Sequence, residues 1–131
     1  MIGVDSNVLL RHLLDDDATQ SRQAAAFFSA RSAKDPAFLS VVVLVETVWT
    51  LSRRDKVPMS RVVAIVSAFL SAEEIVVQAP DVVRRALRDA AEHGTDLADA
   101  IIAHLAIDAD CEYTVTFDRR ASELPGMALL E

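Results

Sequence analysis

The sequence predicts an α/β fold, a three-layer α/β/α sandwich with a mostly parallel central sheet. Two observations lead to this class. Short apolar runs alternate with longer stretches of helical periodicity along the whole chain, and most of these runs are apolar throughout, which is typical of strands covered on both faces. Strands that are separated by helices join in parallel through crossover connections. We therefore expect one sheet with helices on both sides.

The predicted elements follow one another with little connecting chain. Five strands are expected, over Met1 to Val4, Pro36 to Leu39, Glu74 to Gln78, Tyr113 to Phe117 and Met127 to Leu130. Helices are expected after N-cap residues and before glycine or aspartate. They cover a short segment after Ser6 and Asn7 that ends at Leu14, then Ala18 to Ala33, Val41 to Arg54, Val62 to Leu70, Pro80 to His93, and a segment that begins after Thr95 and Asp96.

The length and composition indicate one globular domain, residues 1–131. A single cysteine, Cys111, cannot form an internal disulfide and is expected to be a small core residue. The longest uninterrupted apolar run, Val41 to Val45, is far too short for a membrane span. The first residues have no basic segment of the kind that begins a signal peptide. We expect a cytoplasmic protein that has no membrane partner.

Two aspartates stand directly after predicted strands. Asp5 follows the first strand, and Asp118 follows the strand that ends at Phe117. Ligands of open parallel sheets bind beyond the carboxyl ends of the strands, so both acids are predicted at the binding edge. Aspartate is also common in turns and helix caps, and this alternative role remains open for each of them.

Glu46 interrupts a helix that is apolar on nearly every side. A charge on such a helix is expensive to bury unless it is paired or coordinates a metal. An ion pair with Arg53, two turns further on, is the alternative. Ser40 marks the start of this helix, so Glu46 is expected near the same sheet edge as Asp5.

Asp96 and Asp99 begin the last predicted helix and point to similar sides of its first turn. Capping explains Asp96 well, since aspartate favours a helix N-terminus. Asp99 lies beside the apolar stripe, which makes it the stronger candidate ligand. The formal net charge of −7 falls to −2 when Asp5, Glu46, Asp96, Asp99 and Asp118 are set aside. The remaining surface is therefore close to neutral, and a nucleic-acid substrate is not excluded.

Carboxylates gathered at one edge repel one another unless a cation compensates them. A ligand set made only of oxygen suits Mg²⁺, or Mn²⁺. Such a cation can bind a phosphate oxygen and stabilise a leaving oxygen, so phosphodiester hydrolysis fits best. No serine, cysteine or histidine arrangement competes, because His12, His93 and His104 are scattered and are expected at the surface or at helix edges.

Four segments together resemble the PIN domain family, in particular the VapC-type toxins of bacterial toxin–antitoxin pairs. They are Val4-Asp5-Ser6-Asn7-Val8-Leu9-Leu10-Arg11, Leu39-Ser40 with Val45-Glu46-Thr47-Val48-Trp49, Asp96-Leu97-Ala98-Asp99-Ala100-Ile101-Ile102-Ala103, and Thr114-Val115-Thr116-Phe117-Asp118-Arg119. The resemblance covers essentially the whole chain. Ser6 stands where the family more often has threonine.

The resemblance implies a magnesium- or manganese-dependent endoribonuclease that is blocked by a cognate antitoxin and forms a homodimer. The family's acids map onto Asp5, Glu46, Asp99 and Asp118, with Asp96 as a companion metal ligand. Supporting polar positions map onto Asn7, Ser40 and Thr116. Candidate phosphate contacts are Arg11, Arg53, Arg54, Arg119 and Arg120, although each could equally be a solvated surface charge.

Other classes fit less well. A phosphoacceptor receiver domain needs adjacent acids after the first strand and a lysine after a late strand, but Asp5 is followed by Ser6 and Asn7. A haloacid-dehalogenase-like phosphatase needs a second aspartate at position 7. A catalytically silent module that binds a basic peptide through its acids remains an alternative, and metal-dependent cleavage of RNA would distinguish it from a nuclease.

Overall fold

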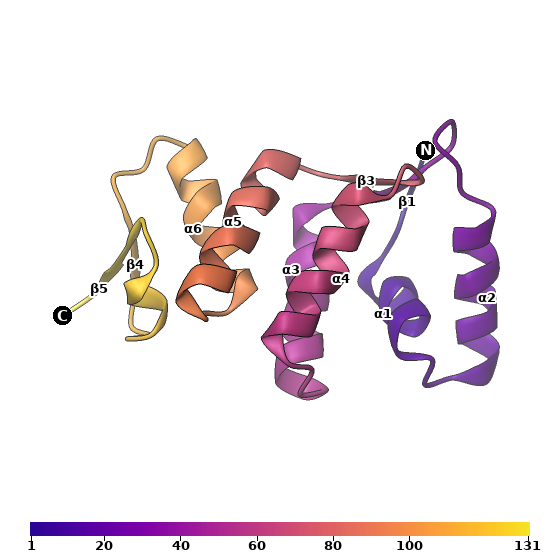
Figure 1. The fold of residues 1–131 in the computed structure, drawn as a ribbon, viewed down its shortest axis with the longest axis horizontal. Coiled ribbons are helices and arrows are strands. Elements are labelled where there is room, and N and C mark those ends of the chain that lie inside the picture. Colours follow the sequence, from indigo (N-terminus) through magenta and orange to yellow (C-terminus); the bar gives the residue numbers. More distant parts are fainter.

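The computed structural model describes the whole chain, Met1 to Glu131. The molecule is elongated, and its two small sheets are separated by helices. One sheet lies at one end of the molecule, whereas further helices lie beyond the other sheet (Figure 1). One sheet has the order β1 (Ile2–Gly3), β2 (Ala37–Leu39), β3 (Ile75–Val77), and the other pairs β4 (Thr114–Thr116) with β5 (Met127–Leu129). All strand pairs are parallel. The α/β class and the parallel pairing are thus confirmed.

The strands do not form the one central sheet that the sequence predicted. In the first sheet β2 lies in the middle, with Ala37 opposite Ile2 on one side and opposite Ile75 on the other. β4 pairs only with β5. The reason is the position of the helical hairpin that precedes β4, formed by α5 (Pro80–His93) and α6 (Leu97–Asp108). This hairpin packs on α3 (Val41–Trp49) and α4 (Met59–Ser71) and holds β4 away from β1 (Figure 1).

Four of the six helices begin where the sequence predicted. The first begins at Ser6, which was predicted to precede it, and the fourth begins at Met59, three residues before the predicted Val62. The six helices are α1 (Ser6–Leu14), α2 (Ala18–Ser29), α3 (Val41–Trp49), α4 (Met59–Ser71), α5 (Pro80–His93) and α6 (Leu97–Asp108), with a short 3₁₀ turn η2 (Ala121–Glu123) before β5. Helix α2 ends four residues earlier than expected. The helix predicted over Val41 to Arg54 changes at Thr50 into a π-helical turn, η1 (Thr50–Arg54). No helix has the length and apolar character that crossing a membrane requires.

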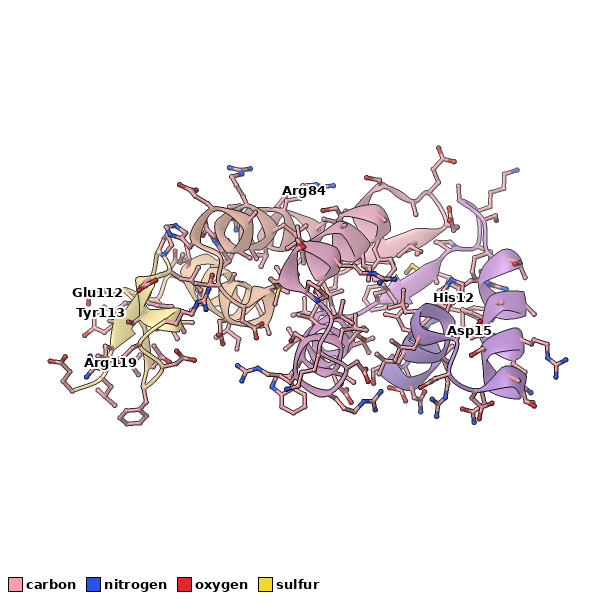
Figure 2. The ribbon with its side chains drawn as sticks, turned by 60° about the horizontal axis from the view of Figure 1, so that its bottom comes forward. His12, Asp15, Arg84, Glu112, Tyr113 and Arg119 are labelled. Atoms are coloured by element: carbon pink, nitrogen blue, oxygen red, sulfur yellow. The ribbon has the colours of Figure 1, made fainter.

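One hydrophobic core joins the first sheet to α3, α4, α5 and α6. Leu39, Leu44, Val83 and Ile101 are fully buried in it. Helices α5 and α6 form a hairpin that is also joined by a hydrogen bond of 2.6 Å between Nε2 of the buried His104 and Asp89. No residue of β4 belongs to this core. The β4–β5 sheet therefore projects from the hairpin, and Tyr113 and Arg119 lie at the opposite end of the molecule from His12 and Asp15 (Figure 2).

The accessible surface reflects this open arrangement. It measures 7488 Å², whereas a compact monomer of 14.3 kDa exposes about 6,800 Å². The molecule thus exposes roughly 700 Å² more than a closed chain of its mass.

Candidate functional site

Three of the predicted acids line one pocket of about 310 Å³. The pocket lies where the π-helical turn η1, the turn between α5 and α6, and the loop after β4 meet. Its charged lining consists of Arg53, Asp96, Asp99, Asp118 and Arg120. Segments far apart in the sequence thus bring three carboxylates and two guanidinium groups to one place.

Asp96 is held by two interactions. Its Oδ1 accepts a hydrogen bond of 2.8 Å from the backbone N–H of Ala98, which makes it the N-cap of α6 as predicted. Its Oδ2 lies 3.6 Å from Nε of Arg53. The carboxylate is mostly buried, whereas the arginine side chain is about half exposed. Arg53 therefore places a positive charge beside Asp96 in the pocket.

Asp99 lies one turn further along α6 and faces the same pocket. Partial burial raises the pKa of its carboxyl above the ordinary value, and the negative charges of Asp96 and Asp118 raise it further. Arg53 acts in the opposite direction but does not cancel these effects. The ionised form of Asp99 is therefore destabilised in the absence of a second positive charge.

Asp118 is fixed by the loop that follows β4. Its Oδ1 accepts hydrogen bonds from the N–H groups of Arg120 (2.9 Å) and Ala121 (3.1 Å). Its own N–H donates to the hydroxyl of Thr116 at 3.0 Å. The Nη2 of Arg120 donates to the carbonyl of Gly94 at 2.6 Å, which ties this loop to the turn before α6.

Asp5 lies away from this pocket. It follows β1 and caps α1, and its Oδ1 accepts a hydrogen bond of 2.8 Å from the N–H of Ser6. Asn7 is exposed on α1 and lines a different cavity, together with Arg11 and Gln20. Neither Asp5 nor Asn7 is among the residues that line the pocket around Asp99.

Glu46 is also separate from this pocket. It lies on α3 and lines a groove between α3 and α6, with Trp49 and Leu105 beside it. The expectation of a buried charge was wrong, because Glu46 is exposed and forms no ion pair. Its proposed partner Arg53 lies in the π-helical turn and pairs with Asp96 instead. Ser40 caps α3, and its hydroxyl accepts a bond of 3.1 Å from the N–H of Val43.

The five candidate arginines divide into two groups. Arg11 pairs with Asp16 at 2.8 Å, and Arg54 pairs with the adjacent Asp55 at 3.2 Å. Both are therefore occupied by surface acids. Arg53, Arg119 and Arg120 remain near the pocket or on its loop.

The remaining reactive side chains have structural surroundings. His12 stacks on Phe28 with ring centroids 4.5 Å apart, and His93 is exposed at the end of α5. His104 is buried, contrary to expectation, because Asp89 pairs with it. Cys111 is not a core residue, since the turn after α6 leaves it exposed.

Sequence reasoning missed one group of possible ligands. Asp89, Glu92 and His93 on α5 have ligand atoms within 4.8 Å of one another. Their spacing on a single helix could have indicated it. The group offers a weak site, because Glu92 and His93 are exposed and Asp89 already bonds to His104. The five predicted acids contain no three whose ligand atoms lie equally close.

The sequence matches the PIN domain family over residues 2–127. This chain belongs to the PIN domain family. PIN domains are generally nucleases. No curated protein matches the sequence.

Proposed function

We propose that this PIN domain is a divalent-metal-dependent endoribonuclease, the toxin of a toxin–antitoxin pair, that hydrolyses RNA phosphodiester bonds. The observation that carries the proposal is the position of Asp99. Its carboxyl has a raised pKa because it is partly buried and because Asp96 and Asp118 share its pocket. A site of this kind favours the binding of a further cation.

The donor set fits Mg²⁺ or Mn²⁺. All the candidate ligand atoms are carboxylate oxygens, which hard divalent cations prefer. Asp5, Asp96 and Asp118 each use Oδ1 to accept a backbone N–H, so their orientation is fixed before any ligand arrives. The second oxygen of Asp5 and of Asp118 makes no bond within the protein and is free to coordinate.

The residues that line the pocket then have separate roles. Asp99 and Asp118 would hold the cation, with Asp96 beside them, whereas Asp5 and Glu46, the further acids of the family pattern, lie outside this pocket. The cation supplies Lewis acidity toward a phosphodiester when it is bound. Arg53 and Arg120 line the same pocket and can donate N–H groups to phosphate oxygens. The position of Arg53 beside Asp96 also limits the repulsion among the acids.

The partners follow from this function and from the resemblance. RNA is the substrate, a cognate antitoxin is the inhibitor, and the protein acts as a homodimer in the cytoplasm, with no membrane partner. The charge of the chain is compatible with an RNA substrate, because the surface outside the five acids is close to neutral.

The test uses two amide variants, Asp5→Asn and Asp118→Asn. Asparagine retains the side-chain oxygen that accepts the backbone N–H bonds, so helix α1 and the loop after β4 keep their caps. The substitution removes the negative charge of the side chain and weakens its binding to a divalent cation. Asp108→Asn is the matched control, because Asp108 lies at the other end of α6 and pairs with Arg85 on the surface. Cleavage of a structured RNA is followed on a gel with Mg²⁺, Mn²⁺ or EDTA.

We expect cleavage by the wild type and by the Asp108 variant in the presence of metal, and none by either of the other two variants. Full activity of Asp118→Asn, or cleavage in EDTA, would contradict the proposal. If the protein binds the RNA but leaves it uncut at saturating Mn²⁺, it is instead a catalytically silent binding module.

A further inference from the structure

Each of the two sheets ends in a strand edge that pairs with no other strand. β1 is an edge strand that pairs only with β2, and the N–H groups of Ile2 and Val4 point to that neighbour. Backbone groups alternate in direction along a strand, so the N–H and C=O of Gly3 face outward. Both residues of β1 are exposed. This edge of the first sheet is open.

β4 presents the matching edge in the other sheet. The N–H of Thr114 and the C=O of Thr116 bond to the β5 side, so the backbone of Val115 faces outward. The apolar side chains of β4 and of the residues that flank it are strongly exposed, with Tyr113 at 53%, Val115 at 52% and Phe117 at 80%. An exposed apolar edge strand is a template for pairing with another chain.

The chain cannot join these two edges in this arrangement. The α5–α6 hairpin separates the sheets and packs on α3 and α4 (Figure 1). Arg53 and Asp96 link it to the π-helical turn, and the core includes Leu97 and Ile101. Bringing β4 to β1 within one chain would require these contacts to break. A second copy can supply the missing strand while they remain intact.

We propose that two copies of this chain exchange their β4–β5 sheets, so that β4 of each copy extends the sheet of the other beside β1. Each copy has one free β1 edge and one free β4 edge, so a two-fold dimer uses all four. The excess exposed surface of roughly 700 Å² is close to the ~800 Å² that one partner covers in a stable complex. The excess exposed surface is therefore of the size that a second copy of the chain would cover.

This exchange would also complete the proposed metal site, and in this respect it rests on the proposed function. With Gly3 opposite Thr116 in a parallel pair, Asp5 of one copy stands beside Asp118 of the other. Both acids follow their strands by two residues, so this register aligns them. The free edge of β3 offers no such match, because Gln78 follows that strand and bonds to the N–H of Val41. The site would then contain residues of two chains.

The first experiment does not depend on activity. Cys111 is exposed, so it is first replaced by serine. In this background Ile2→Cys and Val115→Cys place thiols at positions that the proposed register sets opposite each other, about 5 Å apart. The variant that carries both cysteines is oxidised and examined on a non-reducing gel. A covalent dimer is expected, together with a dimer mass in light scattering.

Two results would overturn the exchange. An internal disulfide in a monomer would mean that the strand folds back onto its own chain. A monomer with no disulfide would mean that the edges stay free. The variant with Ile2→Cys alone serves as the control, since its single thiol has no partner in the proposed register.

The second experiment mixes the two variants already described. Asp5→Asn and Asp118→Asn chains are unfolded together and refolded together. Random pairing makes half of the dimers mixed, and one of the two sites in each mixed dimer combines the intact Asp5 with the intact Asp118. We expect about one quarter of the wild-type activity to return. If each site belongs to one chain, every site carries a defect and no activity returns.

The two experiments separate the two proposals. A covalent dimer without RNA cleavage supports the strand exchange and refutes the nuclease. Cleavage by a monomer supports the nuclease and refutes the exchange.

Discussion

The substitution Asp99→Asn is expected to act in opposite directions with and without a divalent cation. Burial and the charges of Asp96 and Asp118 raise the pKa of the Asp99 carboxyl. Its ionised form therefore costs folding free energy at neutral pH, and the amide removes this cost. Without metal, the variant should be more stable than the wild type. With metal, the order should reverse, because the wild type retains an additional ligand.

The magnitude of the metal effect follows from linkage. A cation present at one hundred times its Kd stabilises the folded state by about 2.7 kcal/mol. A chain of 131 residues has an unfolding entropy that converts 1 kcal/mol into roughly 4 °C of Tm. The wild type should therefore gain about 10 °C. If the loss of one carboxylate weakens binding about tenfold, the variant loses about 1.4 kcal/mol of this gain, or roughly 5 °C.

The pH dependence has a definite sign. Because the pKa of Asp99 is raised in the folded protein, the folded state takes up this proton more readily than the unfolded chain. The favourable contribution is fully present below the ordinary carboxyl pKa and is lost as the pH rises through the raised value. The stability of the wild type relative to Asp99→Asn should thus fall with rising pH in metal-free buffer, and become constant at neutral pH.

The assay is thermal unfolding followed by circular dichroism, in EDTA and in a series of Mg²⁺ or Mn²⁺ concentrations. Asp108→Asn provides the control, because this surface residue should leave the metal shift unchanged. Two outcomes would refute the reasoning about this pocket. One is an Asp99 variant that is less stable than the wild type in EDTA, and the other is an equal metal shift in both proteins.

Two further substitutions test the local structure around the site. Asp96→Ala removes the cap of α6 and should lower the free energy of urea unfolding by about 1 kcal/mol, whereas Asp96→Asn keeps the cap and should change it little; equal losses would contradict the capping role. Gly126→Ala should cost about 1–2 kcal/mol, because residue 126 has φ +83° and its Cβ would approach Ile107. Gly3→Ala, where the space is open, should change little in the same measurement, and a similar loss at both glycines would contradict this explanation.

The features that could be predicted from sequence are those set by neighbouring residues. Asp96 was recognised as a helix cap and Ser40 as a helix start, and α6 and α3 begin directly after them. The cap of α1 is Asp5, one residue before the predicted Ser6 and Asn7. A cap needs only its own side chain and an N–H one to three residues further on. Strand positions were also recovered to within about two residues, because short apolar runs flanked by turns are a local signal.

The features that could not be predicted depend on distant packing. Whether Glu46 is buried is decided by what covers α3, and the position of α6 leaves it exposed. The apolar pattern of Tyr113 to Phe117 predicts a strand but does not specify which chain or sheet pairs with it. The π-helical turn that directs Arg53 toward Asp96 has no sequence signal of its own. Each of these features is determined by tertiary contacts between segments that are distant in the sequence.

The acids of this protein have two roles that can be separated chemically. Asp5, Asp96 and Asp118 stabilise local structure through one oxygen that accepts backbone N–H groups. Asparagine can perform this role equally well, so folding alone does not require aspartate at any of the three positions. Coordination of a divalent cation uses the charge and the second oxygen, which the amide lacks. The proposed metal site accounts for aspartate rather than asparagine at all three positions. Asp99 lies in the first turn of α6, where the helix dipole favours an acid, but its raised pKa shows that burial and the neighbouring acids outweigh this effect, as expected of a ligand that awaits a cation.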